Sequence, residues 1–442
     1  MSGVDRPAPR RPRSDPGLAE LGERRISYAE RMMPLLAALR SRFTADRPFD
    51  GLTVAACLHV TAETAVFLRV LRAGGATVRL AASNPLSTQD DIAAALAADG
   101  GVEVFAKSGV DRDAYYEHIA LAVGAGTEDG TDGGWQGPDL VLDDGGDLMS
   151  TLHTERPELL PGVRGGCEST TTGVARLRRM AADGTLAFPM VAAEASRTRR
   201  MFDNFFGTGQ SVIDGILRAT NTLLAGKVVV VAGYGPCGSG IAERARGLGA
   251  QVIVTEVDPL RALDAHMQGF RVLPMADAAP LGQVFVTATG SRDVIAREHM
   301  EAMRDGAILA NAGHFNVEVD VRALAGLAVA VNPAVRPHAD EYQLADGRRL
   351  ILLAEGRVVN LVAAEGSPAA VMDLAFGVQA LALSWLASDR PGDQAQLLPG
   401  VHEVPAEIDA QIATLALASL GVEIDTLSYV QEEYLDSWRQ GS

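Results

Sequence analysis

The sequence is poor in cysteine, in basic residues and in long apolar runs, and each shortage excludes a class of protein. Only 3 of the 442 residues are cysteines and no CxxC or HxxxH spacing occurs, so we expect no disulfide framework, no metal centre and a reducing compartment. Lys and Arg number 39 against 56 Asp and Glu, and this net charge of −17 disfavours nucleic acid and anionic membranes as partners. No apolar run reaches the length of a membrane span and no apolar segment follows the N-terminal basic residues, so we expect a cytoplasmic protein.

What the sequence does contain is an alternation of apolar strand patterns with helix patterns. The chain is 47% hydrophobic and 21% charged, which is typical of a globular protein, and its length suits two or three domains. Strand patterns at 52–58, 76–82, 102–108 and 139–144 are separated by helical segments, and a second series begins at Lys227. This alternation predicts the α/β class, with two doubly wound parallel-sheet lobes and a helical C-terminal segment.

A glycine-rich turn is the strongest local motif. Gly233, Gly235 and Gly238 form a GxGxxG pattern between an apolar strand and a helix, and Glu256 ends the next strand. In such a loop the first glycine permits a tight turn, the second lets a pyrophosphate approach, and the third lets the helix pack closely. A carboxylate at Glu256 would accept hydrogen bonds from ribose hydroxyls and repel a 2′-phosphate, which favours NAD over NADP. Arg261, shortly after Glu256 in the sequence, weakens the preference for NAD over NADP because a guanidinium can bind a phosphate.

The glycine-rich turn is one of a set of segments spread along nearly the whole chain. They are LHVTAETAV (58–66), STQDDIAAALA (87–97), VLDDGGDL (141–148), HTERPELLPGVRG (153–165), TTTG (170–173), FDNFFGTGQSVIDGILRATN (202–221), GYGPCGSG (233–240), IVTEVDP (253–259), NAGHFNVEVD (311–320) and LAEGRVVNL (353–361). In this combination and order they resemble the S-adenosylhomocysteine hydrolase (adenosylhomocysteinase) family over roughly residues 25–440. GTGQS and the ending YLDSW resemble its short archaeal and thermophilic-bacterial form.

The resemblance implies a domain organisation and an assembly. It implies a homotetramer, or a homodimer, whose lobes close around a nucleoside by a hinge near 197–207 and 362–368. Residues 124–137 are rich in Gly and Asp and predict a surface loop. In chain order we expect a disordered tail (1–17), a substrate-binding domain (18–200 and 368–425), a Rossmann NAD-binding domain (201–367) and a C-terminal helical tail (426–442).

The resemblance also implies a reaction in which NAD is used without net redox change. The 3′-hydroxyl of a nucleoside is oxidised to a ketone, which makes the C4′ hydrogen acidic. The 5′ substituent then leaves, a nucleophile adds to the 4′,5′-alkene, and the ketone is reduced again. Such a site needs a clamp on the 3′-oxygen, acid and base groups near C4′ and C5′, and shielding from water.

Site residues are carried over from the family motifs one at a time. His59 and Asp144 are expected near C5′, Glu63 at the adenine amino group, and His314 near the leaving group. By resemblance the catalytic set is His59, Asp144, Arg199, Asp203 and His314; the substrate set is Thr61, Glu63, Ser169, Asn204, Ser367 and Met372; and the NAD set is Thr170, Thr171, Thr172, Gly233, Gly235, Gly238, Glu256, Thr289, Asn311, Gly313 and Asn360. Without the resemblance, a lone His or Asp is more often structural than catalytic.

Four departures from the family pattern fall in the sugar and purine part of the expected site. Arg199 replaces a lysine, Ser169 replaces a glutamate, Glu194-Ala195 replaces Asn-Asp, and Ser367, with Glu365 two residues before it, replaces a histidine. Arginine stays protonated and has no acceptor, so Arg199 cannot take a proton as a neutral lysine might, although it can stabilise an oxyanion. Glu168 is not expected to substitute for the missing glutamate without a backbone shift. The C-terminal lysine and tyrosine of the longer family form are also absent.

These departures leave three functions open. The first is a specialised paralogue of nucleoside biosynthesis that keeps 3′-oxidation but takes another substrate or a nucleophile other than water. The second is an ordinary hydrolase that converts S-adenosylhomocysteine to adenosine and homocysteine. The third is a catalytically dead, NAD-binding regulatory subunit; loss of the lysine favours it, and retention of Asp203, His59, Asp144 and His314 argues against it.

Overall fold

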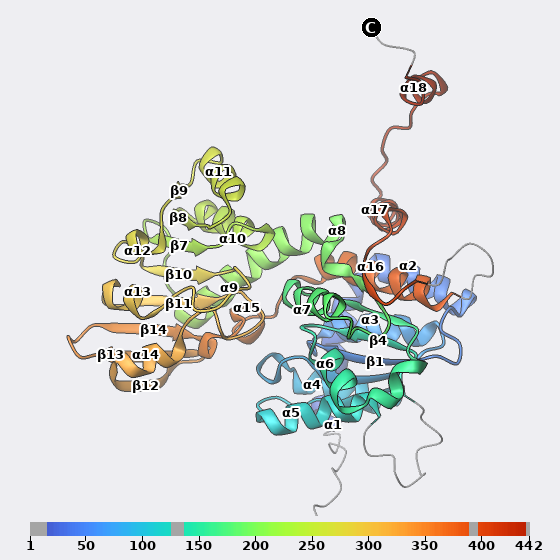
Figure 1. Cartoon of the computed structure of the whole chain (residues 1–442), viewed down its shortest axis with the longest axis horizontal. Coiled ribbons are helices and arrows are strands. Elements are labelled where there is room, and N and C mark those ends of the chain that lie inside the picture. Colours follow the sequence, from blue (N-terminus) through green and yellow to red (C-terminus); the bar gives the residue numbers. More distant parts are fainter. Residues whose placement is uncertain (1–15, 125–136, 389–396, 439–442) are drawn as a thin grey trace, which may run out of the picture.

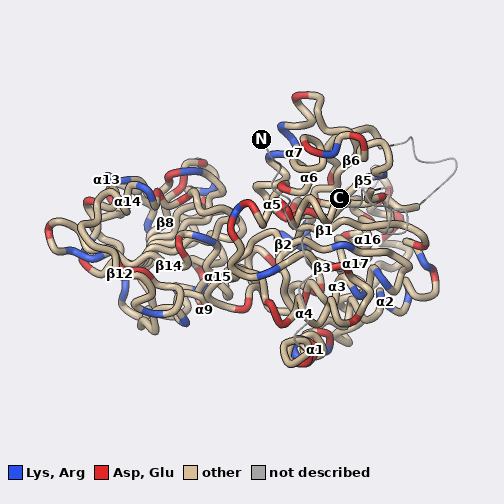
Figure 2. The backbone as a smooth tube through the Cα atoms, turned by 90° about the horizontal axis from the view of Figure 1, so that it is seen from below, with Lys and Arg blue, Asp and Glu red and all other residues tan. Residues whose placement is uncertain are grey.

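The chain folds into two α/β lobes, each built on its own sheet (Figure 1). The structure is a computed structural model and describes residues 16–124, 137–388 and 397–438. The predicted disordered tail lies outside the described residues except for Pro16 and Gly17, which begin the first helix, α1. The predicted surface loop 124–137 also lies outside them except at its two ends. Figure 2 shows acidic and basic residues interspersed over both lobes.

The first sheet is parallel throughout, as the strand patterns predicted. Its order is β15-β6-β5-β4-β1-β2-β3, and every neighbouring pair is parallel. β1 and β2 are almost wholly buried, as expected for strands with helices on both faces. The strands are β1 (Thr53–Leu58), β2 (Thr77–Ala82), β3 (Val102–Phe105), β4 (Leu140–Asp143), β5 (Gly165–Glu168), β6 (Pro189–Ala192) and β15 (Gly400–Glu403).

The second sheet is mixed, and here the expectation of a wholly parallel lobe was wrong at one edge. Its order is β12-β13-β14-β11-β10-β7-β8-β9, and β13 is antiparallel to both of its neighbours, β12 and β14. The connections after Arg336 and Leu344 are too short for a parallel crossover, so they form hairpins. The strands are β7 (Val228–Ala232), β8 (Gln251–Thr255), β9 (Arg271–Val272), β10 (Val284–Thr287), β11 (Ala307–Asn311), β12 (Ala328–Arg336), β13 (Ala339–Leu344) and β14 (Arg349–Leu353).

Helices cover both sheets and begin close to the predicted strand ends. The α-helices are α1 (Pro16–Arg31), α2 (Pro34–Asp46), α3 (Ala62–Ala73), α4 (Asp90–Ala98), α5 (Arg112–Val123), α6 (Asp147–Glu155), α7 (Thr171–Ala182), α8 (Arg197–Arg199), α9 (Gly209–Thr220), α10 (Pro236–Gly247), α11 (Pro259–Met267), α12 (Met275–Ala278), α13 (Arg297–Ala302), α14 (Val321–Leu327), α15 (Val359–Val362), α16 (Ala369–Ala387), α17 (Ala406–Ser419) and α18 (Tyr429–Leu435). Short helical turns are η1 (Pro85–Ser87), η2 (Pro157–Gly162), η3 (Ala193–Ala195) and η5 (Ala354–Gly356), and η4 (Arg200–Thr208) is a π-helix.

The C-terminal part returns to the first lobe. α16 packs into the core around β1, where Phe376 stacks on Phe67 of α3 with ring centroids 4.7 Å apart. By length and composition α16 could cross a membrane, contrary to our statement that no apolar run is long enough, but much of it is buried in this core. The C-terminal segment is also not purely helical, because β15 adds to the edge of the sheet beside β6.

One helical run connects the lobes. α8, η4 and α9 follow one another from Arg197 to Thr220; α8 lies between the two lobes, and α9 belongs to the core of the second lobe (Figure 1). η4 contacts α16 of the first lobe and α10 of the second. Residues 197–207, expected at the hinge, are therefore helical, and they contact both lobes.

Candidate active site

A cavity of about 610 Å³ is lined by residues of both lobes, and most of the predicted site residues meet in it. Its volume is in the usual range for small-molecule sites. The predicted residues that line it are His59, Thr61, Glu63, Asp144, Ser169, Thr170, Thr171, Thr172, Arg199, Asp203, Asn204, Gly235, Thr289, Gly313, His314, Asn360, Ser367 and Met372. The other predicted residues, Gly233, Gly238, Glu256 and Asn311, do not line the cavity.

Two imidazoles lie edge to face in the wall of the cavity. His59 follows β1, His314 follows β11, and their ring centroids are 5.5 Å apart. Nδ1 of His59 lies 2.7 Å from Oγ of Ser87, which orients the ring. Burial lowers the pKa of His59 to about 4, with a further contribution from the nearby charge of Arg199, and burial also lowers the pKa of His314 to about 4. Both rings are therefore neutral at pH 7 and able to accept a proton.

Ser169 lines the cavity, whereas the neighbouring Glu168 does not. The hydroxyl of Ser169 donates a short hydrogen bond to Oδ1 of Asp144, which follows β4. Glu168, the last residue of β5, is fully buried and accepts from the backbone N–H groups of Gly145 and Thr170 at 3.0 and 2.8 Å. Burial, reinforced by the charge of Asp144, raises the pKa of Glu168 to about 8. Glu168 therefore holds two loops in place and does not replace the family glutamate, as the sequence indicated.

Arg199 and Asp203 form a buried ion pair one helical turn apart. Nε of Arg199 lies 3.4 Å from Oδ2 of Asp203, and both side chains are mostly buried. The contact lacks the geometry of a hydrogen bond, and Nε and Nη1 of Arg199 are buried without a hydrogen-bond partner among the described residues. Buried N–H groups of a charged side chain are costly to leave unpaired, so this guanidinium is arranged to receive an oxygen atom from a ligand.

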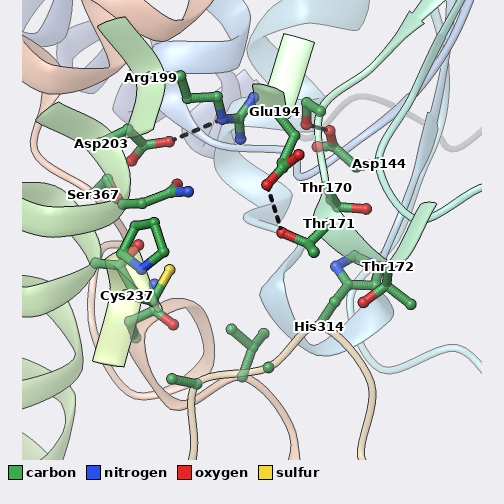
Figure 3. A pocket seen from close by; sticks show the side chains of 18 of the residues that line it. Asp144, Thr170, Thr171, Thr172, Glu194, Arg199, Asp203, Cys237, His314 and Ser367 are labelled. Atoms are coloured by element: carbon green, nitrogen blue, oxygen red, sulfur yellow. Dashed lines mark hydrogen bonds and ion pairs between the residues drawn. The ribbon is translucent and has the colours of Figure 1, made fainter. Parts of the chain in front are cut away.

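The two added carboxylates point in different directions. Glu194 is buried in η3, and its Oε1 accepts a hydrogen bond from Oγ1 of Thr171 at 3.0 Å. In Figure 3 its side chain lies in the cavity between Arg199 and Thr171. Glu365 instead sits at the rim with a 61% exposed side chain, and pairs with Arg25 at 2.6 Å. Only Glu194 therefore places its carboxylate inside the site.

Glu63 and Ser367 lie at the end of the cavity where the family motifs place the purine. Glu63 is in the first turn of α3, whose N-terminus is capped by Thr61, and burial raises the pKa of its carboxyl. Ser367 packs against η4, since a Cβ added at Gly207 would lie 2.8 Å from its Oγ. Arg199, Ser169 and Ser367, all departures from the family pattern, thus line one cavity together with Glu194.

Gly235 and α10 form an open cradle in the second lobe. Gly233 has φ +94°, and a Cβ at Gly238 would lie 1.9 Å from the carbonyl oxygen of Gly233, so both positions require glycine. A Cβ at Gly235 would meet only Nη1 of Arg261, at 3.5 Å, which leaves space in front of the backbone. The N-terminus of α10 has no side-chain cap, so its N–H groups are available to an anion.

Glu256 is turned toward its own loop. Its carboxylate accepts hydrogen bonds from the backbone N–H groups of Tyr234, Val257 and Asp258 at 2.7, 2.7 and 3.0 Å. It does not line the cavity. Its predicted contact with a ribose therefore stays a prediction, and in this structure the residue fixes the shape of the glycine turn.

Comparison with known proteins decides the family. Residues 14–160 match the family described as S-adenosyl-L-homocysteine hydrolase, and residues 204–366 match its NAD binding domain. The chain is 54% identical to an adenosylhomocysteinase of Aquifex aeolicus over 97% of this chain and 99% of the relative. Its identity to an adenosylhomocysteinase of Thermococcus kodakarensis is 51%, over 97% of this chain and 98% of the relative. The relative from Saccharolobus solfataricus is also 51% identical, over 97% and 99%.

The chain belongs to the S-adenosylhomocysteine hydrolase family. It is thus an NAD-dependent enzyme of the adenosylhomocysteinase type, and the resemblance to archaeal and thermophilic-bacterial members is confirmed.

The cradle fits the NAD that the adenosylhomocysteinase family uses. Gly235 and the first turn of α10 suit the pyrophosphate, because backbone N–H groups point there and no Cβ intervenes. Oδ1 of Asn360 is a buried acceptor in the cavity wall without a partner among the described residues, so it is free for a ligand. When bound, NAD supplies a hydride acceptor. Burial raises the pKa of Cys237, in the first turn of α10, to about 12, so this thiol is inert, as the sequence suggested.

Three supporting residues were not found from the sequence. Glu318 accepts from the backbone N–H of Thr289 at 2.9 Å, from its hydroxyl at 2.6 Å and from Gly290 N–H at 2.9 Å, and so fixes the loop after β10. Ser87 orients His59. Arg200 approaches Oε2 of Glu194, with its Nη2 at 3.7 Å. Glu318 and Ser87 each carried a signal, because they lie inside the NAGHFNVEVD and STQDDIAAALA segments, whereas Arg200 lies in none of the quoted segments.

Asn311, which was predicted to contact NAD, holds a neighbouring loop in place. It is fully buried, and its amide donates to the carbonyl oxygens of Gly313, Phe315 and Gly356 at 3.2, 2.9 and 2.9 Å. These bonds shape the loop that carries His314. Among the described residues no cluster of three or more His, Cys, Asp or Glu is placed to hold a metal ion.

Proposed function

We propose that this adenosylhomocysteinase-type enzyme transiently oxidises the 3′-hydroxyl of an adenine nucleoside, releases the 5′ substituent and adds a nucleophile to the resulting 4′,5′-alkene. The single observation that carries the proposal is the arrangement of one cavity. The Arg199–Asp203 pair, two neutral imidazoles and an open cradle for a dinucleotide all line or adjoin it. These groups match the needs of the reaction, namely a clamp on the 3′-oxygen and proton acceptors near C4′ and C5′.

S-adenosylhomocysteine and water are the simplest substrate and nucleophile. High identity to adenosylhomocysteinases over nearly the whole chain supports this reading. The products would then be adenosine and homocysteine.

A second candidate is a specialised paralogue in nucleoside biosynthesis that acts on a related nucleoside or uses another nucleophile. It is favoured by the position of the departures, since Arg199, Ser169, Glu194 and Ser367 line the same cavity while the cradle keeps the family pattern. Substitutions that drift without consequence would be expected to scatter.

Product analysis by mass spectrometry tests both candidates. The purified protein, loaded with NAD, is incubated with S-adenosylhomocysteine alone and with candidate acceptors. Homocysteine and adenosine as sole products would assign ordinary hydrolysis, and an adduct at C5′ would assign the specialised reaction. No turnover, together with no transient absorbance of NADH with any nucleoside, would instead identify a catalytically dead subunit.

A further inference from the structure

We propose that Glu194 is the base that accepts the proton of the 3′-hydroxyl in this chain. The inference rests on the proposed 3′-oxidation and deepens it by assigning a residue that the family motifs do not mark. It answers a problem set by Arg199, whose guanidinium cannot accept a proton.

The other acidic side chains that line the cavity either have close partners or lie away from Arg199. Asp203 is paired with Arg199 at 3.4 Å. Oδ1 of Asp144 accepts the short hydrogen bond from Ser169. Glu63 lies on α3, at the end of the cavity assigned to the purine, and Glu365 is exposed at the rim and bound to Arg25. Asp203 and Asp144 therefore have partners closer than the 3.7 Å that separates Oε2 of Glu194 from Arg200, and Glu63 and Glu365 lie elsewhere.

Glu194 is the carboxylate that remains available. Its side chain is 10% exposed and enters the cavity from η3, directly after β6. The hydrogen bond from Thr171 engages Oε1, whereas Oε2 accepts no hydrogen bond from the described residues and has Arg200 at 3.7 Å. Figure 3 shows the carboxylate between Arg199 and Thr171, with one oxygen fixed by Thr171, in the wall of the cavity.

Glu194 lies beside Arg199, and the two side chains suit different parts of the 3′-hydroxyl. The unpaired Nε and Nη1 of Arg199 suit the oxygen as it gains negative charge, and Oε2 of Glu194 suits its proton. In the oxidation the O–H bond breaks and its proton passes to Oε2. The C3′–H bond breaks and its electron pair leaves as hydride to bound NAD, so the carbon is oxidised, the nicotinamide is reduced and a C=O bond forms.

A binding measurement tests the contact without any turnover. Titration calorimetry on the protein freed of NAD compares adenosine with 3′-deoxyadenosine for the wild type and for Glu194→Gln. Glutamine keeps the size of the side chain and the bond from Thr171 but is a weaker, uncharged acceptor. We expect the preference for adenosine to fall about five- to tenfold in the variant. Glu301→Gln, on exposed α13, is the matched control and should leave the preference unchanged.

Transient kinetics on the NAD-loaded protein tests the proton transfer itself. Glu194→Gln should slow the appearance of NADH with adenosine at least about 100-fold, the usual size of a lost general base. Adding Arg199→Lys to that variant should restore much of the rate, because a lysine amine can accept the proton. A normal rate in Glu194→Gln, or an unchanged preference for adenosine, would overturn the assignment. Failure of the proposed function looks different, since the wild type itself would then form no NADH.

Discussion

At the scale of single residues, Asp203 is expected to act mainly by balancing the positive charge of Arg199. Asp203→Asn leaves the buried guanidinium of Arg199 without its counter-charge, which disturbs the clamp on the 3′-oxygen. We expect NADH formation with adenosine to fall below detection, while the thermal unfolding midpoint shows whether the chain remains folded. A folded variant that oxidises adenosine at the wild-type rate would contradict this role.

Arg199 is the departure most directly connected to the chemistry. Arg199→Lys restores the family residue and with it an amine that can lose its proton. If Arg199 is the main determinant of the altered activity, this variant should cleave S-adenosylhomocysteine faster than the wild type, as measured by release of homocysteine thiol. No gain in cleavage would show that Ser169, Glu194 and Ser367 matter as much.

The two buried imidazoles predict how stability depends on pH. Their folded pKa values near 4 lie below the ordinary value of about 6.5, so the unfolded chain binds more protons between these limits. Their contribution to stability is therefore present above pH 6.5 and is lost as the pH falls toward 4. Glu168 has the opposite effect on stability. Because burial raises its folded pKa to about 8, its ionisation disfavours folding, and stability is lost as the pH rises from about 4.5 toward 8.

A His314→Gln variant separates the contribution of this imidazole to the pH dependence from those of His59 and Glu168. We expect the free energy of unfolding, measured by urea denaturation, to depend less on pH between 6.5 and 4 than in the wild type. Asp144 and Asp147 raise the pKa of His314 whereas His59 and Arg176 lower it, and burial outweighs them all. An identical pH dependence in the two proteins would mean that the imidazole is hydrated in the folded state.

At the scale of elements, the glycine turn before α10 separates the requirements of folding from those of binding. A methyl group at Gly235 meets only a side-chain nitrogen of Arg261, so Gly235→Ala should fold with nearly wild-type stability. The same methyl group enters the space where a pyrophosphate approaches, so we expect the affinity for NAD, measured by calorimetry, to fall at least about tenfold. Gly247→Ala, at the other end of α10 with nothing within 4 Å, should leave NAD binding unchanged.

The elements also show what sequence patterns can and cannot predict. β1 and β7 were predicted because continuous apolar runs mark buried parallel strands. β5, with the sequence GGCE, carries no such run; a Cβ at Gly166 would come within 2.3 Å of Val141, so close packing of its neighbour requires glycine there. The π-helix η4 gave no signal, since it depends on packing between α10 and α16. In the site, the family motifs supplied residues such as His59 and included Ser87, but the contact between these two side chains became visible only in three dimensions.

At the scale of the whole molecule, the end of the described chain stands apart from both lobes. After α17 the chain runs out to α18, which lies away from the rest of the protein (Figure 1). Large apolar side chains in and around α18 are open to solvent, with Ile424 71% exposed, Tyr429 77% and Trp438 88%. A lone chain rarely exposes so many large apolar groups in one segment, and the expected homotetramer or homodimer would provide a surface to cover them.

Removal of this arm tests its part in assembly. A variant that ends at Gly421 loses no residue of either core, so its unfolding midpoint should match that of the dissociated wild type. If the arm joins subunits, the molar mass measured by light scattering should fall to that of a smaller species, and replacing Ile424, Val430 and Leu435 by serine should have the same effect. An unchanged mass in both variants would show that the subunits meet elsewhere, and the exposed arm would then need a different partner.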